Sequence, residues 1–388
     1  MSAKAILRNA KLTSAGATRN LDIFIKDGLI NNLLPAGENS DLPRNCPVYD
    51  LKGKYVFPGI FDSHIHGSNG VDLNHIDNEK LDHFSCYLAK RGVTAFFASI
   101  VSDSDEKLYK LLQFYAQAAE RDLPGARLAG IHLEGPWISP RRSGAISDAN
   151  LKRPQLELLK RYQAAAQGWI KYITVAPELE GAFALIEKSP FYGISVGLGH
   201  TEASYELGCE AIAKGAKLAT HLGNAMTRIH QRRPGIIGAI LESDLPLELI
   251  FDGIHIHPAN LRLISKIVSF DRIIGVSDAT MARGLADGDY VLGTMEFTLE
   301  NGVSRLKGSN TLAGSTLDPI QAIKNAAEIL DVDIKEVYPF FSLNPARLYS
   351  QNTGELAEGR LADLLVFNEK FELSETWVAG RHVFSAVL

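Results

Sequence analysis

The residues of this chain that could do chemistry lie at the ends of short apolar runs. The run "YVFPGIFDSHIH" ends in His64 and His66, which are separated by one isoleucine. Side chains two residues apart in a strand point to the same side, so both imidazoles can face one ion. The pair alone is a weak signal, because imidazole is also a common packed or surface group. Other parts of the chain have to decide between a metal pair and ordinary strand-end residues.

Several later runs also close on an ionisable residue. These residues are Glu134 in "IHLEGP", His200 in "GLGHTEA", His221 in "ATHLGNAM", His255 and His257 in "DGIHIHP", and Asp278 in "GVSDAT". Glutamate and histidine are ligands that suit zinc or a similar first-row divalent ion, with one position left for water. Their wide spacing excludes a zinc-finger module and indicates a site assembled by tertiary structure.

Asp278 has a chemistry of its own. A carboxylate beside such a site can take a proton from an attacking water and return it to a leaving amine. Two structural alternatives stay open at this point. Asp278 could cap a helix, and Glu134 could belong to an ordinary salt bridge.

The elements that position these residues follow from periodicity. Eight apolar runs alternate with helical patterns such as "LDHFSCYLAKRG" and "SYELGCEAIAKG". This alternation over residues 57–347 predicts a (β/α)8 TIM barrel, in which the strand ends converge on one face. A doubly wound open sheet is the competitor, but no glycine-rich phosphate fingerprint follows the first strand. Convergence on one barrel face favours catalysis over the structural alternatives.

Both ends of the chain are rich in strand patterns. Hairpin signals occur around Lys26-Asp27-Gly28 and around Ala379-Gly380. Residues 1–56 and 348–388 are therefore predicted to form one small β-sandwich domain that brackets the barrel.

Composition excludes several classes of protein. The 388 residues are 46% hydrophobic and 22% charged, with a net charge of −5, so no basic field invites nucleic acid. The three cysteines, Cys46, Cys86 and Cys209, are too few and too widely spaced for a disulfide framework. No signal peptide or run of about 20 apolar residues is present. We expect a soluble cytoplasmic protein that binds neither nucleic acid nor membrane.

At these residues the chain resembles the amidohydrolase superfamily and, within it, the N-acetylglucosamine-6-phosphate deacetylases. The matching stretches include "PGIFDSHIHG", "GIHLEGPWISP", "GLGHTEA", "THLGNAM", "DGIHIHP", "VSDAT" and "NPARLYSQNTGELAEGRLADLLVF". The resemblance implies a barrel with a small β domain made from both termini. It also implies a metal-dependent hydrolase that removes the acetyl group from an N-acetylated amino-sugar 6-phosphate.

The resemblance implies roles for individual residues as well. Glu134, His200 and His221 match the main metal ligands, His64 and His66 match a second ligand pair, and Asp278 matches the catalytic acid/base. The implied substrate contacts are Ala145, Asn224, Ala225, Arg232, His255, Leu312, Ala313 and Gly314. One or two divalent ions per subunit are expected, with Zn²⁺ as the first choice and Fe²⁺, Mn²⁺ or Co²⁺ as alternatives. A homodimer is implied, because the arginine can reach across the subunit interface in this family.

One position departs from the family pattern. Ile146 stands where the family usually has a His or Gln that contacts the substrate, and its side chain cannot donate or accept a hydrogen bond. The galacto epimer of the sugar therefore stays an alternative, and Ser143 or Ser147 could compensate. Another amidohydrolase activity, or a non-catalytic barrel scaffold, are the remaining alternatives.

Overall fold

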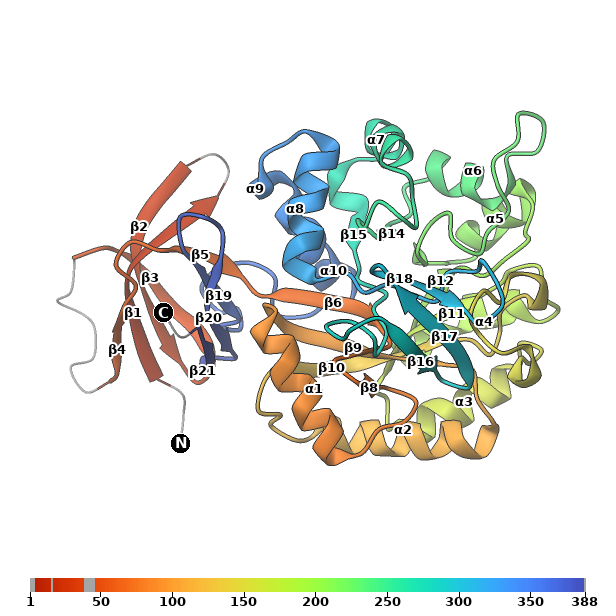
Figure 1. Ribbon diagram of the computed structural model, residues 1–388, viewed down its shortest axis with the longest axis horizontal. Coiled ribbons are helices and arrows are strands. Elements are labelled where there is room, and N and C mark those ends of the chain that lie inside the picture. The colour runs from red at the N-terminus through yellow and green to blue at the C-terminus, as the bar shows by residue number, and fades with distance from the viewer. Residues whose placement is uncertain (1–3, 15–16, 38–45, 387–388) are drawn as a thin grey trace.

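The computed structural model describes residues 4–14, 17–37 and 46–386 (Figure 1). Residues 1–3, 15–16 and 38–45 of the predicted β domain, and the last two residues of the chain, lie outside the described residues. Two bodies are visible in Figure 1: a β sheet that joins the red N-terminal and dark blue C-terminal strands, and a larger barrel ringed by helices.

Eight parallel strands form the barrel sheet in chain order. They are β6 (Ile60–Ile65), β9 (Val93–Val101), β10 (Arg127–Glu134), β11 (Ile170–Val175), β12 (Ser195–Leu198), β13 (Leu218–Ala219), β14 (Leu247–Leu249) and β15 (Ile273–Gly275). A parallel bridge between Ile65 and Ala279 brings the chain after β15 against β6. The Asp278 N–H donates to the His64 carbonyl at 2.9 Å, so two strands that carry candidate site residues are tied together. The predicted barrel is confirmed.

Helices cover the outside of the barrel (Figure 1). They are α1 (Asn78–Lys90), α2 (Asp105–Ala119), α3 (Leu156–Ala165), α4 (Ala182–Lys188), α5 (Tyr205–Ala213), α6 (Gly235–Glu242), α7 (Pro258–Ile267), α8 (Pro319–Leu330), α9 (Ile334–Val337) and α10 (Leu343–Leu348). In α1, Asp77 caps the first turn by accepting from the Lys80 N–H, and the buried stripe includes Leu81, Phe84 and Leu88. Such stripes bury each helix against the strands. Within the described residues, no helix has the length and apolar character required to cross a membrane.

The second sheet joins the two ends of the chain. Its strands are β1 (Lys4–Ser14), β2 (Ala17–Lys26), β3 (Leu29–Pro35), β4 (Val48–Asp50), β5 (Tyr55–Pro58), β19 (Leu364–Phe367), β20 (Leu373–Val378) and β21 (Arg381–Ser385). The hairpins predicted at Asp27-Gly28 and Ala379-Gly380 are present, and all four residues have positive φ, as a tight turn of this kind needs. β5 pairs antiparallel with β19 and leads directly into β6.

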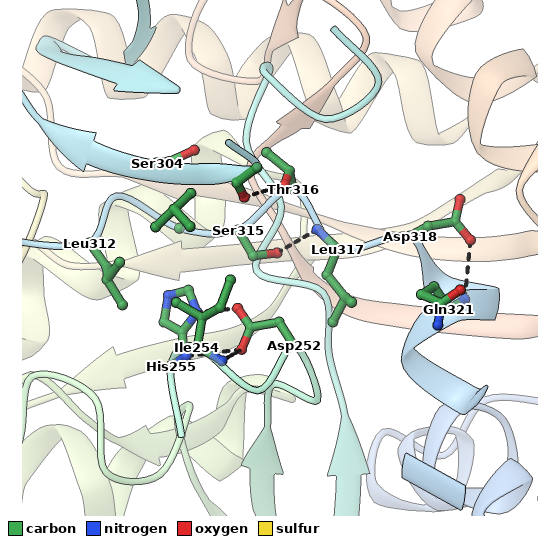
Figure 2. Close-up of a pocket in the computed structure, with 13 residues that line it drawn as sticks. Asp252, Ile254, His255, Ser304, Leu312, Ser315, Thr316, Leu317, Asp318 and Gln321 are labelled. Carbon is green, nitrogen blue, oxygen red and sulfur yellow. Dashed lines mark hydrogen bonds and ion pairs between the residues drawn. The ribbon is translucent and has the colours of Figure 1, made fainter. Parts of the chain in front are cut away.

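Shorter strands lie over the mouth of the barrel. They are β7 (Gly67–Ser68) with β8 (Val71–Asp72), and the antiparallel set β16 (Gly288–Leu292), β17 (Met295–Glu300) and β18 (Val303–Leu306). A cavity of about 300 Å³ lies beside this set, and Ser304 of β18 is among its lining residues. Figure 2 shows Asp252 and His255 across this cavity from Ser304.

Candidate active site

The structure brings six of the predicted residues together at the mouth of the barrel. His64 and His66 lie at the end of β6, and Glu134 ends β10. His200, His221 and Asp278 follow β12, β13 and β15 within three residues. All six side chains are buried, and the most exposed, Asp278, is only 8% exposed. His257 lies outside this group, because its ring accepts from the Ala259 N–H at the start of α7.

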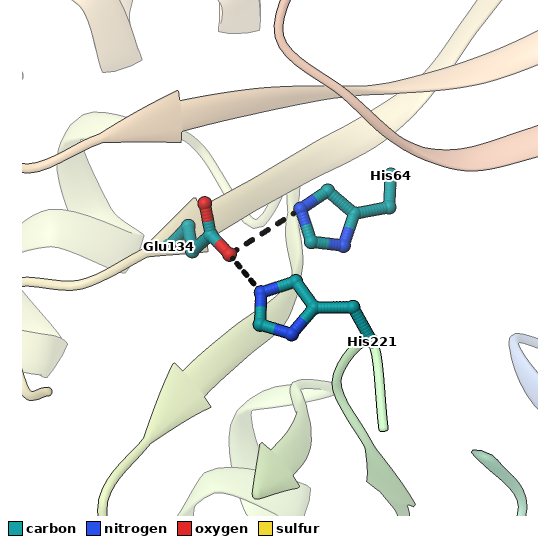
Figure 3. A group of neighbouring side chains, drawn as sticks. All are labelled: His64, Glu134 and His221. Carbon is teal, nitrogen blue, oxygen red and sulfur yellow. Dashed lines mark hydrogen bonds and ion pairs between the residues drawn. The ribbon is translucent and has the colours of Figure 1, made fainter. Parts of the chain in front are cut away.

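Glu134 lies between the two pairs of histidines. Its Oε1 is 2.9 Å from His221 Nε2, 3.1 Å from His200 Nε2 and 3.4 Å from His64 Nε2. Its Oε2 is 3.1 Å from His66 Nε2. Figure 3 shows the His64 and His221 rings pointing at the same carboxylate oxygen. One carboxylate therefore contacts both pairs of histidines.

The inward-facing ring nitrogens are close to one another. His64 Nε2 is 3.1 Å from His66 Nε2, and His200 Nε2 is 3.0 Å from His221 Nε2. The outward Nδ1 of His66 faces the Ser99 carbonyl at 3.2 Å, and that of His200 faces the Arg142 carbonyl at 2.7 Å. Since a carbonyl only accepts, each Nδ1 donates, so Nε2 is the nitrogen whose lone pair faces inward when it carries no proton. Lone pairs and carboxylates that converge in this way fit a divalent cation.

Three of the strand-end residues have a left-handed backbone. The φ angles are 48° at His200, 24° at His221 and 48° at Asp278. Residues other than glycine rarely adopt this region, and each instance costs about 1–3 kcal/mol. The turn after each strand redirects the side chain into the mouth of the barrel. Three of the six residues that form the site thus carry backbone strain.

The electrostatics keep Asp278 and Glu134 as carboxylates. Burial alone raises the pKa of Asp278, but the hydrogen bond from His66, at 3.3 Å, and nearby charge bring it below the ordinary value. Burial likewise opposes ionisation of Glu134, yet His64 and His200 hold its pKa well below the usual range. Burial lowers the pKa of His66, and its bonds to Asp278 and Glu134 raise it to about 9. Asp278 is therefore suited to accept a proton at neutral pH.

A cavity of about 480 Å³ opens over these groups. Six of the predicted substrate contacts line it, and they are Ala145, Asn224, Ala225, His255, Leu312 and Gly314. Ala313 is fully buried and does not line the cavity, so it supports the loop from behind. Arg232 is exposed on the loop between β13 and α6 and is not among the lining residues of this subunit's cavity.

His255 is held by a buried carboxylate. Its Nδ1 lies 2.6 Å from Asp252 Oδ2 (Figure 2). Burial alone lowers the pKa of His255, but the bond to Asp252 raises it above the ordinary value for histidine. The contact with Asp252 therefore favours the positively charged ring, at a wall shared by both cavities.

Residues that the sequence analysis missed also line or support the site. Arg141 and Arg142 line the cavity, and each lies within 3.8 Å of Glu202. The sequence contains a signal for both arginines, because they directly follow "HLEGPWISP", the stretch that includes Glu134. Glu248 is fully buried in β14 and contacts His64 and His221. A single glutamate within the apolar run "LPLELIF" needs a buried partner, and that was its signal.

The position that departs from the family pattern forms an apolar wall. Ile146 is 4% exposed and packs in a cluster with Ala145, Leu292 and Ala313. Of the two serines expected to compensate, Ser143 lines the cavity and Ser147 is not among its lining residues.

Comparisons with known proteins agree with this geometry. Residues 55–383 match the amidohydrolase family. An N-acetylglucosamine-6-phosphate deacetylase from Vibrio furnissii is 33% identical over 359 residues, which cover 92% of this chain and 90% of the relative. An N-acetylgalactosamine-6-phosphate deacetylase from Escherichia coli O157:H7 is 31% identical and covers 95% and 96% of the two chains. The structure of an N-acetyl-D-glucosamine-6-phosphate deacetylase variant from Mycobacterium smegmatis, in complex with N-acetyl-D-glucosamine-6-phosphate, has a TM-score of 0.89 at 29% identity and covers 99% of this chain and 100% of its own.

The two ligand pairs predict a graded response to mutation. Replacing both His64 and His66 by alanine removes two ring nitrogens but leaves Glu134, His200 and His221 in place. We expect the metal content per subunit to fall while the circular dichroism spectrum is retained, and elemental analysis of the purified protein measures the fall. The matched double variant of His75 and His83, which lie outside the site, should keep the metal content of the wild type. Equal metal content in both double variants would contradict the second ligand pair.

Proposed function

Because the chain belongs to the amidohydrolase family, we propose that it hydrolyses the amide of N-acetyl-D-glucosamine 6-phosphate to D-glucosamine 6-phosphate and acetate. The observation that carries the proposal is Glu134 between two histidine pairs, with Asp278 beside it, on the floor of a cavity with arginines in its wall. Relatives about 30% identical over nearly the whole chain, named as deacetylases of amino-sugar 6-phosphates, support the same reaction.

A divalent metal ion belongs to this proposal. Glu134, His200 and His221 would hold it, and His64 and His66 would hold a second one, with Glu134 between the two. Zn²⁺ is proposed as the ion, since glutamate and histidine suit it, and Fe²⁺, Mn²⁺ and Co²⁺ accept similar ligands. When bound, the metal supplies Lewis-acid polarisation and a lowered pKa for water.

Asp278 moves the proton in the proposed reaction. Its carboxylate takes one proton from the attacking water as the new carbon–oxygen bond forms. It then delivers that proton to the amide nitrogen as the carbon–nitrogen bond breaks, so the amine leaves neutral. The water oxygen stays on the acyl carbon as acetic acid, which becomes acetate by losing the remaining proton to solvent. The low pKa of Asp278 makes the carboxylate available for the first of these transfers.

The phosphate of the substrate needs positive partners, because the protein has a net charge of −5. Within one subunit, Arg141, Arg142 and protonated His255 line the cavity and could contact a phosphate. Arginine offers a bidentate fork to such an oxyanion. A substrate with about two negative charges does not cross a bilayer unaided, which supports our placing the reaction in the cytoplasm.

We further propose a homodimer in which Arg232 reaches the cavity of the partner subunit. Four large apolar residues support an interface on this side: Ile229 and Ile254 are 56% and 45% exposed, and Leu263 and Ile267 of α7 are 57% and 60% exposed. Ile229 lies on the same loop as Arg232. Exposed apolar residues of this size are typical of surfaces that associate.

The second candidate substrate is N-acetylgalactosamine 6-phosphate. A relative of that name matches almost the whole chain at 31% identity. The apolar wall at Ile146 also offers no side-chain hydrogen bond to a sugar hydroxyl or amide. The two epimers therefore have to be compared directly.

A substrate panel tests the reaction. We expect acetate release from N-acetylglucosamine 6-phosphate to exceed that from N-acetylgalactosamine 6-phosphate, and both to exceed release from the unphosphorylated sugars.

A variant of Asp278 tests its role as the proton carrier. Asp278→Asn keeps the size of the side chain but removes the proton acceptor, so turnover should fall by about 10²–10⁴-fold at wild-type metal content. Acetate assay and elemental analysis of the same samples measure both quantities. Substantial turnover by the asparagine variant would exclude Asp278 as the proton carrier.

Protonation of His255 predicts a dependence on pH. The raised pKa means that the ring keeps its positive charge to higher pH than an ordinary histidine and loses it as the pH rises through that pKa. KM for the phosphorylated sugar should therefore rise at alkaline pH, whereas KM for the unphosphorylated sugar should not follow. Asp252→Asn removes the charge that raises the pKa and should move the rise in KM to lower pH. A KM that stays constant between about pH 6 and 9 would argue against a charged His255 at the phosphate.

Substitutions of the neighbouring residues Arg232 and Arg233 provide a matched pair of variants that tests the proposed dimer. Arg232→Gln should raise KM for the phosphorylated sugar about 10–100-fold, as expected when a charged hydrogen bond is lost, whereas Arg233→Gln should leave KM near that of the wild type. Mixing Arg232→Gln with Asp278→Asn subunits creates dimers in which one cavity has both residues if Arg232 acts on the partner. Recovery of activity in the mixture, with the dimer mass confirmed by light scattering, is the expected result. No recovery would place Arg232 outside the partner's cavity.

A further inference from the structure

Glu248 is a buried carboxylate that contacts both histidine pairs. It lies in β14 and is fully buried. Its Oε2 is 2.9 Å from His64 Nδ1 and accepts from the His221 backbone N–H at 3.1 Å. Its Oε1 has no hydrogen-bond partner among the described residues. The Glu248 side chain thus hydrogen-bonds to one histidine of each pair, His64 and His221.

The contact decides which nitrogen of His64 carries the proton. A carboxylate without a proton only accepts, so Nδ1 of His64 has to donate to Glu248. When Nε2 carries no proton, as metal binding requires, its lone pair faces the opposite side, where Glu134 Oε1 lies at 3.4 Å and His66 Nε2 at 3.1 Å. The hydrogen bond also fixes the rotation of the ring, which the edge of the His132 ring contacts at a centroid distance of 4.5 Å.

His64 differs from the other candidate ligands in this respect. His66 and His200 donate to neutral backbone carbonyls, and no partner of His221 Nδ1 is found among the described residues. A fully buried carboxylate with one unsatisfied oxygen is costly unless positive charge lies nearby. A cation on the far side of the His64 ring would supply that charge.

We propose that Glu248 is a positioning residue that holds His64 in the tautomer and orientation needed to bind metal at the His64/His66 position. This inference rests on the metal site of the proposed function and extends it to a residue outside the ligand set. Through the His221 backbone, the same carboxylate ties the second ligand pair to the first.

Two isosteric variants separate this role from simple space filling. Glu248→Met fills the volume but cannot accept a hydrogen bond, whereas Glu248→Gln keeps an oxygen that can accept from His64 Nδ1. We expect Glu248→Met to weaken metal binding at the His64/His66 position about 10–100-fold, as loss of such an outer partner does. Glu248→Gln should bind with intermediate affinity.

The measurement is a titration of metal-free protein with Co²⁺, followed by its visible absorption, without any sugar present. The absorption that the wild type gains on Co²⁺ binding, and that the variant with both His64 and His66 replaced by alanine does not gain, is the signal of the His64/His66 position. In a His64→Ala background, Glu248→Met should cause no further loss, because the residue acts through His64. Wild-type Co²⁺ affinity and spectrum in Glu248→Met, or an equal loss in both backgrounds, would overturn the proposal.

Folding and function are controlled separately. If circular dichroism shows that metal-free Glu248→Met is unfolded, Glu248→Gln replaces it in the test. Its Co²⁺ affinity is then compared with that of the wild type, and the same substitution is made in the His64→Ala background. If the wild type releases acetate from no sugar in the panel but Glu248→Met still loses Co²⁺, the proposed function fails and the positioning role stands. If the wild type is active and Glu248→Met binds Co²⁺ normally, the proposed function stands and the positioning role of Glu248 fails.

Discussion

Four imidazole nitrogens and two carboxylates meet at one end of the barrel, and the rest of the structure depends on keeping them there. Like lone pairs about 3 Å apart repel one another, so their arrangement is stable only with positive charge among them. Their outer nitrogens are tied to groups that differ in kind, a backbone carbonyl for His66 and His200 and a carboxylate for His64. Three of the four rings are thus oriented by a hydrogen bond from the nitrogen that faces away from the centre of the site.

The barrel supplies this organisation through its strands rather than its loops. The barrel strands are mostly apolar and nearly all of their residues are buried, and such close packing makes the position of each strand end nearly rigid. The left-handed residues His200, His221 and Asp278 then turn the chain sharply at that end. Since the helices and core stabilise the whole, a few kcal/mol of local strain is tolerated where function requires it.

The sequence predicted the barrel, the hairpins and the six converging residues because each depends on local pattern and strand order. His64 and His66 share a side by their spacing, and the strand-end position of Glu134 and His200 follows from barrel geometry. Glu248 was missed because the pattern of β14 does not show which of its alternating residues faces the barrel interior. The partners of Arg232 depend on how surfaces meet, and a single chain's periodicity carries no information on that. The pairing of Asp252 with His255 depends on the loop conformation after β14, which apolar patterning does not specify either.

The sheet that joins the two ends of the chain has a consequence for synthesis. β5 leads into β6, the strand that carries His64 and His66, yet its neighbour β19 lies more than 300 residues later in the chain. Until the ribosome has delivered residue 367, one edge of β5 is without its antiparallel partner. The β5–β19 pairing of the small sheet therefore forms only after nearly the whole barrel has been synthesised. A product that ends before β19 keeps an open strand edge, which can pair with strands of other chains.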